Sequence, residues 1–242
     1  MRERKLVGAL LCALALWSAG PAAAAGGSAA FCTENHGTWD RGVCTAHGTN
    51  AHNIDVKITA RYPDDLLADP AAEPVLKEFV RAFFTRFEHL DDLFVRDGFA
   101  DLKYQTFTHG PDIRSVVFTN LWDLGGAHPN DEMTTFTVDL RRGKVLALAD
   151  LFCVGVDPLI ELPPLARPYV EKAIGPKFDI AQFEPGSKNS FADDYQAWYL
   201  DGDDLVLVMP SARSGPATAG LWQPHVPLSQ LHSILRDGAC AA

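Results

Sequence analysis

The stretch from Ser115 to Phe152 decides the fold of this chain. It contains Ser115-Val-Val-Phe-Thr-Asn-Leu-Trp-Asp123, then Leu124-Gly-Gly-Ala-His-Pro-Asn130, then Glu132-Met-Thr-Thr-Phe-Thr-Val-Asp-Leu140. Side chains in the third piece alternate with a two-residue period, which predicts a strand with one buried face and one wet face. The set expected to be buried is Thr134, Phe136, Val138 and Leu140, and the set expected to be wet is Thr135, Thr137 and Asp139.

The first of these pieces is expected to pair with the third. Residues 115–123 are rich in Val, Phe, Thr and Trp, which fit the pleated surface of a strand. Between the two pieces, Gly125 and Gly126 permit a positive φ and Pro129 cannot extend a hydrogen-bonded ladder. We therefore expect two neighbouring antiparallel strands joined by an irregular, glycine-led loop.

Other alternating segments predict further strands. In residues 53–62, Ile54, Val56 and Ile58 alternate with polar residues, so this segment is expected to be a half-buried first strand. The remaining expected strands are residues 99–107, 197–200 and 205–209, with an edge strand at 223–226.

The clearest helix signal runs from Pro74 to Leu90. Apolar residues recur there at steps of three and four, which is typical of an amphipathic helix that covers a sheet. Later helices are expected to be smaller, because prolines interrupt the next candidate and leave only Ala166 to Ile174. A short C-terminal helix is expected over residues 228–235. The apolar stripe of the long helix is Leu76, Phe79, Val80, Phe83, Phe87 and Leu90.

These elements predict an α+β fold: an antiparallel-dominated sheet covered by one long amphipathic helix, with smaller later helices. They are expected to form a single domain over residues 26–242. Residues 26–31 are expected to be a flexible start, and Cys32 to His52 a small, turn-rich disulfide loop.

Residues 1–25 predict a secretory signal peptide, with a retained membrane anchor as the alternative. Its apolar run is too short to span a bilayer, and no later run approaches about 18 apolar residues, so no membrane span is expected after cleavage. The mature protein is therefore expected to be secreted or periplasmic. The signal consists of the basic residues Arg2, Arg4 and Lys5, the apolar run Leu6–Trp17 and the small residues Ala22–Ala25.

The mature chain is expected to be strongly acidic. Cleavage removes three basic residues and one acidic residue, which changes the formal net charge from −10 to −12. Such a chain repels phosphate backbones, so nucleic acid is not an expected partner, whereas a basic protein is attracted.

Four cysteines remain after cleavage, and an even number in an exported chain predicts disulfides. Cys32 and Cys44 are close in sequence and are expected to pair, which leaves Cys153 with Cys240, although three pairings are possible in principle. His36 and His47 follow the first two cysteines at spacings that resemble a zinc site. We favour a disulfide beside two exposed histidines, and expect no metal.

No standard catalytic motif is present. The sequence has no Gly-x-Ser-x-Gly elbow, phosphate loop, dinucleotide fingerprint or His-Glu-x-x-His motif, so no cofactor is expected. The acidic turn at Asp201–Asp204 lacks the spacing of a calcium loop. Because triads are defined by geometry rather than by sequence, a non-standard serine site remains open. The histidines available as its base are His109, His128, His225 and His232.

Gly125, Gly126 and His128 are the candidate ligand-binding residues. Two glycines before a histidine allow both the backbone and the ring to lie near a ligand. The alternative is that His128 only caps a hairpin loop.

Several short motifs resemble the extracytoplasmic domain shared by the lysozyme-sensing anti-sigma factor and by secreted mycobacterial immunogenic proteins. The resemblance covers most of the chain, from Phe31 to about Leu235. The matching segments are Leu124–Pro129, Phe136–Leu140, Leu148–Phe152, Tyr62–Asp64, Tyr195–Gln196 and Gly220…Val226-Pro227, with an early cysteine pair.

This resemblance implies an α+β fold and an exported protein, some of whose relatives are esterases and others binders of lysozyme or of host components. The chain departs from these relatives in its Pro210–Gly220 loop, in the extra Cys153 and Cys240, and in showing no cytoplasmic or transmembrane segment.

We therefore expect a secreted or envelope-exposed, non-enzymatic binding protein. Its partner is expected to be a protein, either lysozyme-like or a host or envelope component, contacted by the loops at Gly125–Asn130 and Pro210–Gly220. The alternative is a weak esterase with a non-standard serine site. The oligomeric state is not indicated by the sequence.

Overall fold

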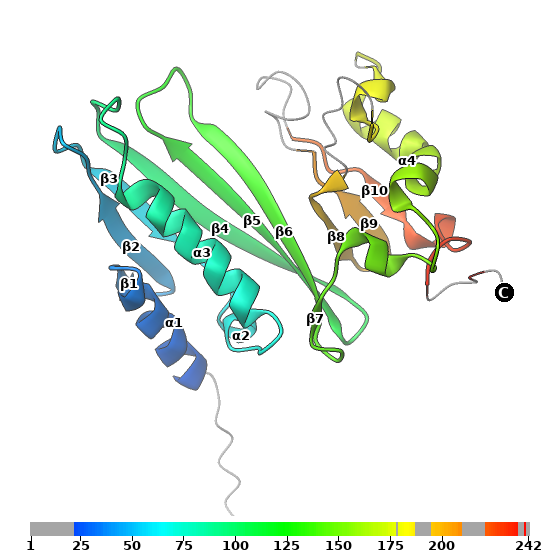
Figure 1. Ribbon diagram of the computed structural model, residues 1–242, viewed down its shortest axis with the longest axis horizontal. Helices are drawn as coiled ribbons and strands as arrows, with labels where there is room; N and C mark the ends of the chain where they lie inside the picture. Colours follow the sequence, from blue (N-terminus) through cyan, green and yellow to red (C-terminus); the bar gives the residue numbers. More distant parts are fainter. Residues whose placement is uncertain (1–21, 178, 187–194, 210–220, 237–239, 241–242) are drawn as a thin grey trace, which may run out of the picture.

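The computed structural model describes residues 22–177, 179–186, 195–209, 221–236 and 240. Its ten strands form two sheets, one of seven strands and one of three, beside a small number of helices (Figure 1). The α+β class and the mostly antiparallel pairing are confirmed. The division of the strands into two sheets was not indicated by the sequence.

The larger sheet has the strand order β1-β2-β3-β4-β5-β6-β7. Neighbouring strands are antiparallel except for β3 and β4, which are parallel. The chain crosses from β3 to β4 through two helices, as parallel pairing requires. The elements are β1 (Thr38–Asp40), β2 (Val43–Gly48), β3 (Val56–Ala60), α2 (Asp64–Leu67), α3 (Glu73–Glu88), β4 (Gly98–His109), β5 (Ile113–Asp123), β6 (Asn130–Asp139) and β7 (Lys144–Val145).

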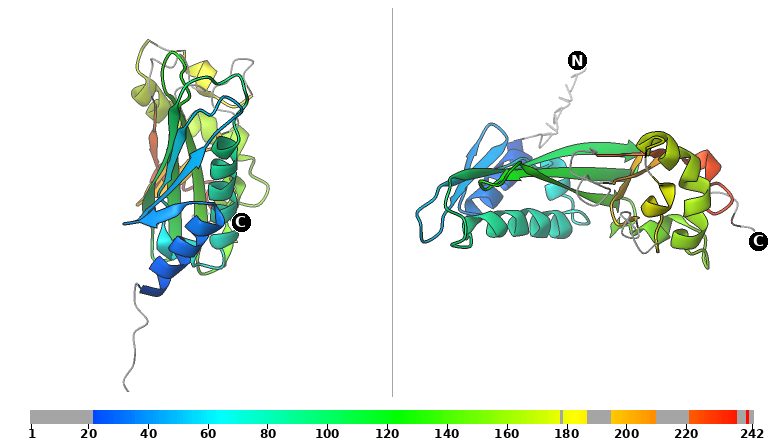
Figure 2. Two further views of the ribbon diagram at one scale, coloured as in Figure 1. Left: turned by 90° about the vertical axis from the view of Figure 1, so that its left-hand side faces the viewer. Right: turned by 90° about the horizontal axis from the view of Figure 1, so that it is seen from above.

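Helix α3 covers one face of this sheet, as its apolar stripe predicted (Figure 2). Pro74 lies in the first turn, where its missing N–H costs no helical hydrogen bond. Phe79 packs against Phe118 of β5 and Phe136 of β6, with ring centroids 4.8 and 5.5 Å apart. The buried residues of the helix are Leu76, Val80, Phe83, Phe84 and Phe87.

The N-terminal segment differs from the expected flexible start and loop. Residues 26–31 belong to helix α1 (Ala22–Glu34), and much of the segment from Cys32 to His52 forms the hairpin of β1 and β2 at the edge of the sheet. The predicted Cys32–Cys44 disulfide is confirmed and fully buried, and it fastens the end of α1 to β2. Residues 1–21 of the predicted signal peptide lie outside the described residues.

The smaller sheet has the order β10-β9-β8, and helix α4 packs against it. The expectation that prolines stop α4 before Ala166 is wrong, because the helix starts at Pro158. The Asp157 carboxylate accepts a hydrogen bond from the Leu159 N–H at 2.9 Å and so caps the N-terminus of α4. Burial of one helix face against the sheet offsets the hydrogen bonds lost at Pro163, Pro164 and Pro168. The elements are η1 (Leu148–Leu151), α4 (Pro158–Ile174), η2 (Ile180–Phe183), β8 (Trp198–Asp201), β9 (Asp204–Leu207) and β10 (His225–Pro227).

The C-terminal helix expected over residues 228–235 is reduced to the 3-10 turn η5 (Leu228–Gln230). The chain after it instead pairs with the segment that follows η1. The Cys153 N–H donates to the Ile234 carbonyl, and the Arg236 N–H donates to the Leu151 carbonyl, both at 2.9 Å. The Cys153–Cys240 disulfide, also predicted, links the segment after η1 covalently to the C-terminal segment.

The face of β6 that was expected to be wet is partly buried. Thr137 and Asp139 are each only 2% exposed, because the smaller sheet packs on this face of the β5–β6 hairpin. The hydroxyls there satisfy strand β8: the Trp198 N–H donates to Thr135 Oγ1 at 3.0 Å, and the Leu200 N–H donates to Ser115 Oγ at 3.1 Å. Polar side chains are therefore buried between the two sheets, where they accept hydrogen bonds from the backbone of β8.

No helix among the described residues is long and apolar enough to cross a membrane.

Replacing Ser115 by Ala is expected to destabilise this junction. The buried Ser115 hydroxyl also bonds to Thr137 Oγ1 at 3.0 Å, so its loss leaves two buried polar groups without this partner. We expect the free energy of unfolding to fall by about 1–3 kcal/mol, measured by urea denaturation. Ser229→Ala, at an exposed position, is the matched control and should change it by less than about 0.5 kcal/mol. Equal effects of the two variants would contradict a structural role for the Ser115 hydroxyl.

Candidate functional site

The predicted binding residues lie in the loop between β5 and β6, at the end of the hairpin remote from the smaller sheet (Figure 1). Gly125, Gly126 and His128 are all exposed. Gly125 has φ +88°, which justifies glycine at this position, and its backbone packs beside the Arg96 side chain. The prediction of an irregular, glycine-led connection is confirmed. Ligand binding by this loop stays a prediction.

Three loops meet at this end: residues 49–55, 89–97 and 124–130, which we call the three-loop end. The first two are joined by hydrogen bonds. Asn50 Nδ2 donates to the carbonyls of Asp91 and Phe94 at 3.0 and 2.7 Å. The third joins them where Gly125 packs on Arg96. The loops are therefore held together by specific contacts.

Two large apolar side chains project from the three-loop end into solvent. Leu93 is 83% exposed and Val95 is 67% exposed. They flank Phe94, which is partly buried and packs on the core below. Exposed apolar side chains that occur singly need no explanation, but two on one hydrogen-bonded loop, beside a second exposed loop, form a surface suited to a protein contact.

The same end carries four aspartates that accept backbone N–H groups, two within their own turns and two from a neighbouring loop. None of these carboxylates forms an ion pair with a lysine or arginine among the residues that the structure describes, so each contributes a negative charge to the surface. Each accepts a backbone N–H at 2.7–2.9 Å: Asp91 from Leu93, Asp92 from Ala51, Asp97 from Asp55 and Asp123 from Gly125.

His128 forms a local hydrogen bond. Its Nδ1 lies 2.9 Å from the Pro129 carbonyl, so the ring is oriented by its own loop. This geometry fits the capping role that was the alternative for this residue. The second predicted loop, Pro210–Gly220, lies outside the described residues.

Among the described residues, two of the other candidate histidines bond to groups other than a serine hydroxyl. His109 Nδ1 lies 2.6 Å from the Gly202 carbonyl, and His225 Nδ1 lies 3.2 Å from Asp204 Oδ2. The two buried serines bond elsewhere: the Ser28 hydroxyl donates to Asp64, and Ser115 bonds to Thr137. In the described part of the chain, no serine hydroxyl bonds to a histidine ring.

The zinc-like spacing is explained by the disulfide. Cys32 and Cys44 are bonded to each other, and His36 and His47 are exposed. The described residues contain no cluster of three or more side chains suited to a metal ion.

A second candidate site, which the sequence did not indicate, lies where the two sheets meet. A cavity of about 230 Å³ opens there between the β4–β5 turn, the β6–β7 turn and the C-terminal segment; we call it the junction cavity. Its lining residues come from separate segments that extend from His109 to Arg236, more than 100 positions apart in the sequence. No local sequence pattern therefore indicates the site. The charged lining residues are Asp112, Asp139, Arg141, Arg142, Asp150 and Arg236.

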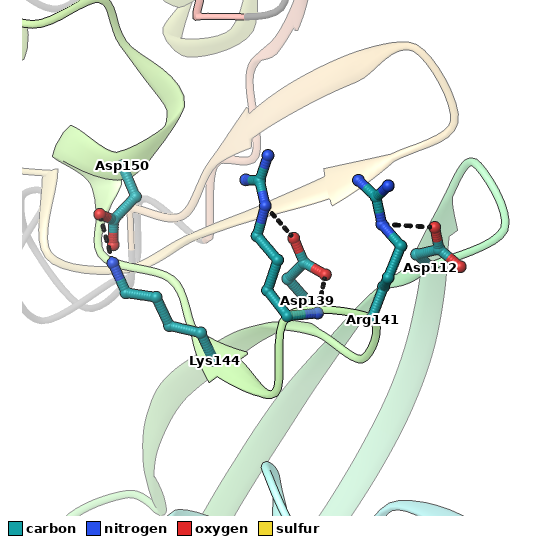
Figure 3. Close-up of polar contacts among 6 residues, drawn as sticks. Asp112, Asp139, Arg141, Lys144 and Asp150 are labelled. Atoms are coloured by element: carbon teal, nitrogen blue, oxygen red, sulfur yellow. Dashed lines mark hydrogen bonds and ion pairs between the residues drawn. The ribbon is translucent and has the colours of Figure 1, made fainter.

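Ion pairs organise the rim of the junction cavity (Figure 3). Arg141 Nε lies 3.3 Å from Asp112 Oδ2, and Lys144 Nζ donates to Asp150 Oδ1 at 2.6 Å. The Lys144 hydrogen bond, helped by the Ala147 N–H and the nearby Arg236 charge, holds the pKa of the Asp150 carboxyl below its ordinary value. Asp150 therefore stays ionised at neutral and mildly acidic pH, and its ion pair with Lys144, at the start of β7, is kept in that range.

No protein-family model matches the chain. A curated relative, esterase Rv3036c of Mycobacterium tuberculosis (strain ATCC 25618 / H37Rv), is 28% identical over 118 residues, which cover 49% of this chain and 50% of the relative. The chain thus spans about half the length of the curated relative that it matches.

Two solved structures are similar to this one. A DUF3298 family protein from Bacteroides fragilis NCTC 9343 is 15% identical, with a TM-score of 0.53 over 81% of this chain and 92% of that chain. A DUF3298 family protein from Pseudomonas aeruginosa PAO1 is 16% identical, with a TM-score of 0.49 over 80% of this chain and 94% of that chain. At these identities the likeness concerns the fold alone, and the Bacteroides structure supports a DUF3298-like fold for this chain.

Proposed function

We propose that this chain is a secreted or envelope-exposed, non-enzymatic binding protein that holds a basic protein partner at its three-loop end. The observation that carries the proposal is the exposure of Leu93 and Val95 on a loop fastened to the predicted binding loop at Gly125–Asn130. Export rests on the signal-peptide pattern, and two disulfides are consistent with an oxidising compartment.

The chemistry of this end favours one kind of partner. Leu93 and Val95 supply apolar contact area, and the four carboxylates of this end outnumber the one arginine of the three loops, Arg96, so that the surface attracts positive charge. The whole chain carries a formal net charge of −10, so its long-range field acts in the same direction. A basic protein with an apolar patch meets both requirements.

We expect lysozyme to bind one-to-one in calorimetry, with saturable binding that persists at high salt. Lysozyme is the probe because it is basic and because the sequence resembles the sensor domain of the lysozyme-sensing anti-sigma factor. Replacing both Leu93 and Val95 by Ser should weaken binding by about tenfold or more, since buried apolar anchors dominate such interfaces. Both side chains are largely exposed in the free protein, so the variant should fold normally.

Val154→Ser is the matched control, because Val154 is 96% exposed and belongs to none of the three loops, following Cys153 in the chain, and it should leave binding unchanged. Binding that disappears at high salt would indicate only general charge attraction. If Gly126→Arg and His128→Ala also leave every detected interaction unaltered, the assignment of the site to Gly125, Gly126 and His128 is wrong.

The second candidate function is a weak esterase. It is favoured by the partial identity with the mycobacterial esterase. Its nucleophile would have to be a serine other than Ser28 and Ser115, whose hydroxyls are buried and hydrogen-bonded inside the fold. Ser229 and Ser233, both exposed and close in sequence to His232, remain among the described residues.

An esterase reaction predicts time-dependent hydrolysis of p-nitrophenyl butyrate that is abolished by a single Ser→Ala change. Loss of an activated nucleophile lowers kcat by several orders of magnitude. The assay should therefore cover Ser229→Ala, Ser233→Ala and the serines of the mature chain outside the described residues, each compared with heat-denatured protein. A rate that no serine variant changes would exclude this candidate and leave the binding function.

A further inference from the structure

We propose that the junction cavity binds a small organic carboxylate with an apolar body. The carboxylate would lie against the guanidinium groups of Arg141, Arg142 and Arg236, and the apolar body against the hydrocarbon wall of the cavity. This site is independent of the three-loop end. The apolar wall consists of Ile113, Leu146, Leu151, Leu200, Leu228 and Leu235.

The three guanidinium groups have hydrogen-bond donors to spare. Arg141 and Arg142 approach Asp112 and Asp139 through Nε, at 3.3 and 3.5 Å, and each guanidinium carries five N–H donors, more than one such contact uses. Arg236 forms no side-chain ion pair with any described residue, although its charge acts on Asp150. A guanidinium fork with free Nη donors matches the two oxygens of a carboxylate.

The charge balance of the lining favours a monoanion. The three arginines face three aspartates, Asp112, Asp139 and Asp150, and Lys144 beside them is bonded to Asp150. With His109, which also lines the cavity, in its neutral form, the cluster has one positive charge in excess. A carboxylate neutralises that excess, whereas a phosphate dianion would place additional negative charge beside Asp139, whose side chain is only 4% exposed.

The size of the cavity limits the ligand. A volume of about 230 Å³ lies below that of typical drug-sized pockets, so the ligand is a short carboxylate rather than a long lipid. Six aliphatic side chains around one charged rim are suited to a ligand with one charged end and one apolar end.

The backbone of Arg236 is held beside the cavity before any ligand arrives. Its N–H donates to the Leu151 carbonyl at 2.9 Å, and Leu235 forms an antiparallel bridge with Phe152. The Cys153–Cys240 disulfide fastens the same two segments together. Because the backbone position is set in advance, only the Arg236 side chain has to be ordered when an anion binds, and it makes no ion pair with the described residues that a substitution would break.

The experiment compares three six-carbon probes by titration calorimetry and by NMR chemical shifts: hexanoate, hexanol and hexylamine. We expect hexanoate to bind at least about tenfold more tightly than hexanol, because charge-assisted hydrogen bonds are the stronger ones. Hexylamine should bind more weakly than hexanol. Arg236→Gln should weaken hexanoate binding about tenfold and leave hexanol binding unchanged, and because Arg236 is exposed the variant should fold normally.

Arg81→Gln is the matched control, because Arg81 lies on α3 in an exposed ion pair with Glu78, and it should not alter hexanoate binding. Equal affinity for hexanoate and hexanol, or hexanoate binding that Arg236→Gln and Arg142→Gln both leave unchanged, overturns the proposal. Inorganic phosphate that binds more tightly than hexanoate at the same arginines overturns the carboxylate assignment.

Discussion

The two sheets are joined by hydroxyl groups that accept the backbone N–H groups of strand β8. That strand is the edge of the smaller sheet, so its outward N–H groups have no neighbouring strand. Thr135 and Ser115, on the long hairpin, accept the N–H groups of Trp198 and Leu200. A buried edge without these acceptors would leave unsatisfied donors, so the position of the smaller sheet on the hairpin depends on them.

The β5–β6 hairpin therefore serves both ends of the molecule. Strand β5 has 11 residues, which at the usual rise of a strand places its ends roughly 35 Å apart. One end carries the glycine-led loop of the three-loop end, and the other forms part of the junction cavity. The two proposed binding surfaces are thus separated by the length of one hairpin, which explains why a protein partner and a small ligand would not compete.

Local sequence patterns predicted an element correctly where its own residues determine which face is buried. The Pro74–Leu90 stripe predicted α3, alternation predicted β4 and β6, and the β-branched and aromatic composition of residues 115–123 predicted β5. Such patterns failed at Thr137 and Asp139, which have the composition of a wet face but are buried by a sheet from much later in the chain. They failed in α4 for a similar reason, since tertiary burial outweighs the local cost of three prolines.

One candidate site could be predicted from local sequence and the other could not. Gly125, Gly126 and His128 could be found because glycine and histidine in a loop give a local signal, but Leu93 and Val95 resemble ordinary apolar residues until the fold exposes them. The junction cavity has no local signal at all. Asp112, Arg142 and Arg236 come together only when the β4–β5 turn, the β6–β7 turn and the C-terminal segment meet.

The Cys153–Cys240 bond changes the topology of the second half of the chain. It closes a covalent ring with a sequence separation of 87 residues, and the whole three-stranded sheet and helix α4 belong to that ring. A single peptide-bond cleavage anywhere within the ring leaves both fragments covalently connected, with Arg236 still on the same molecule as the hairpin. The ring also restricts the unfolded chain, which stabilises the folded state by about 4–5 kcal/mol in the chain-entropy description.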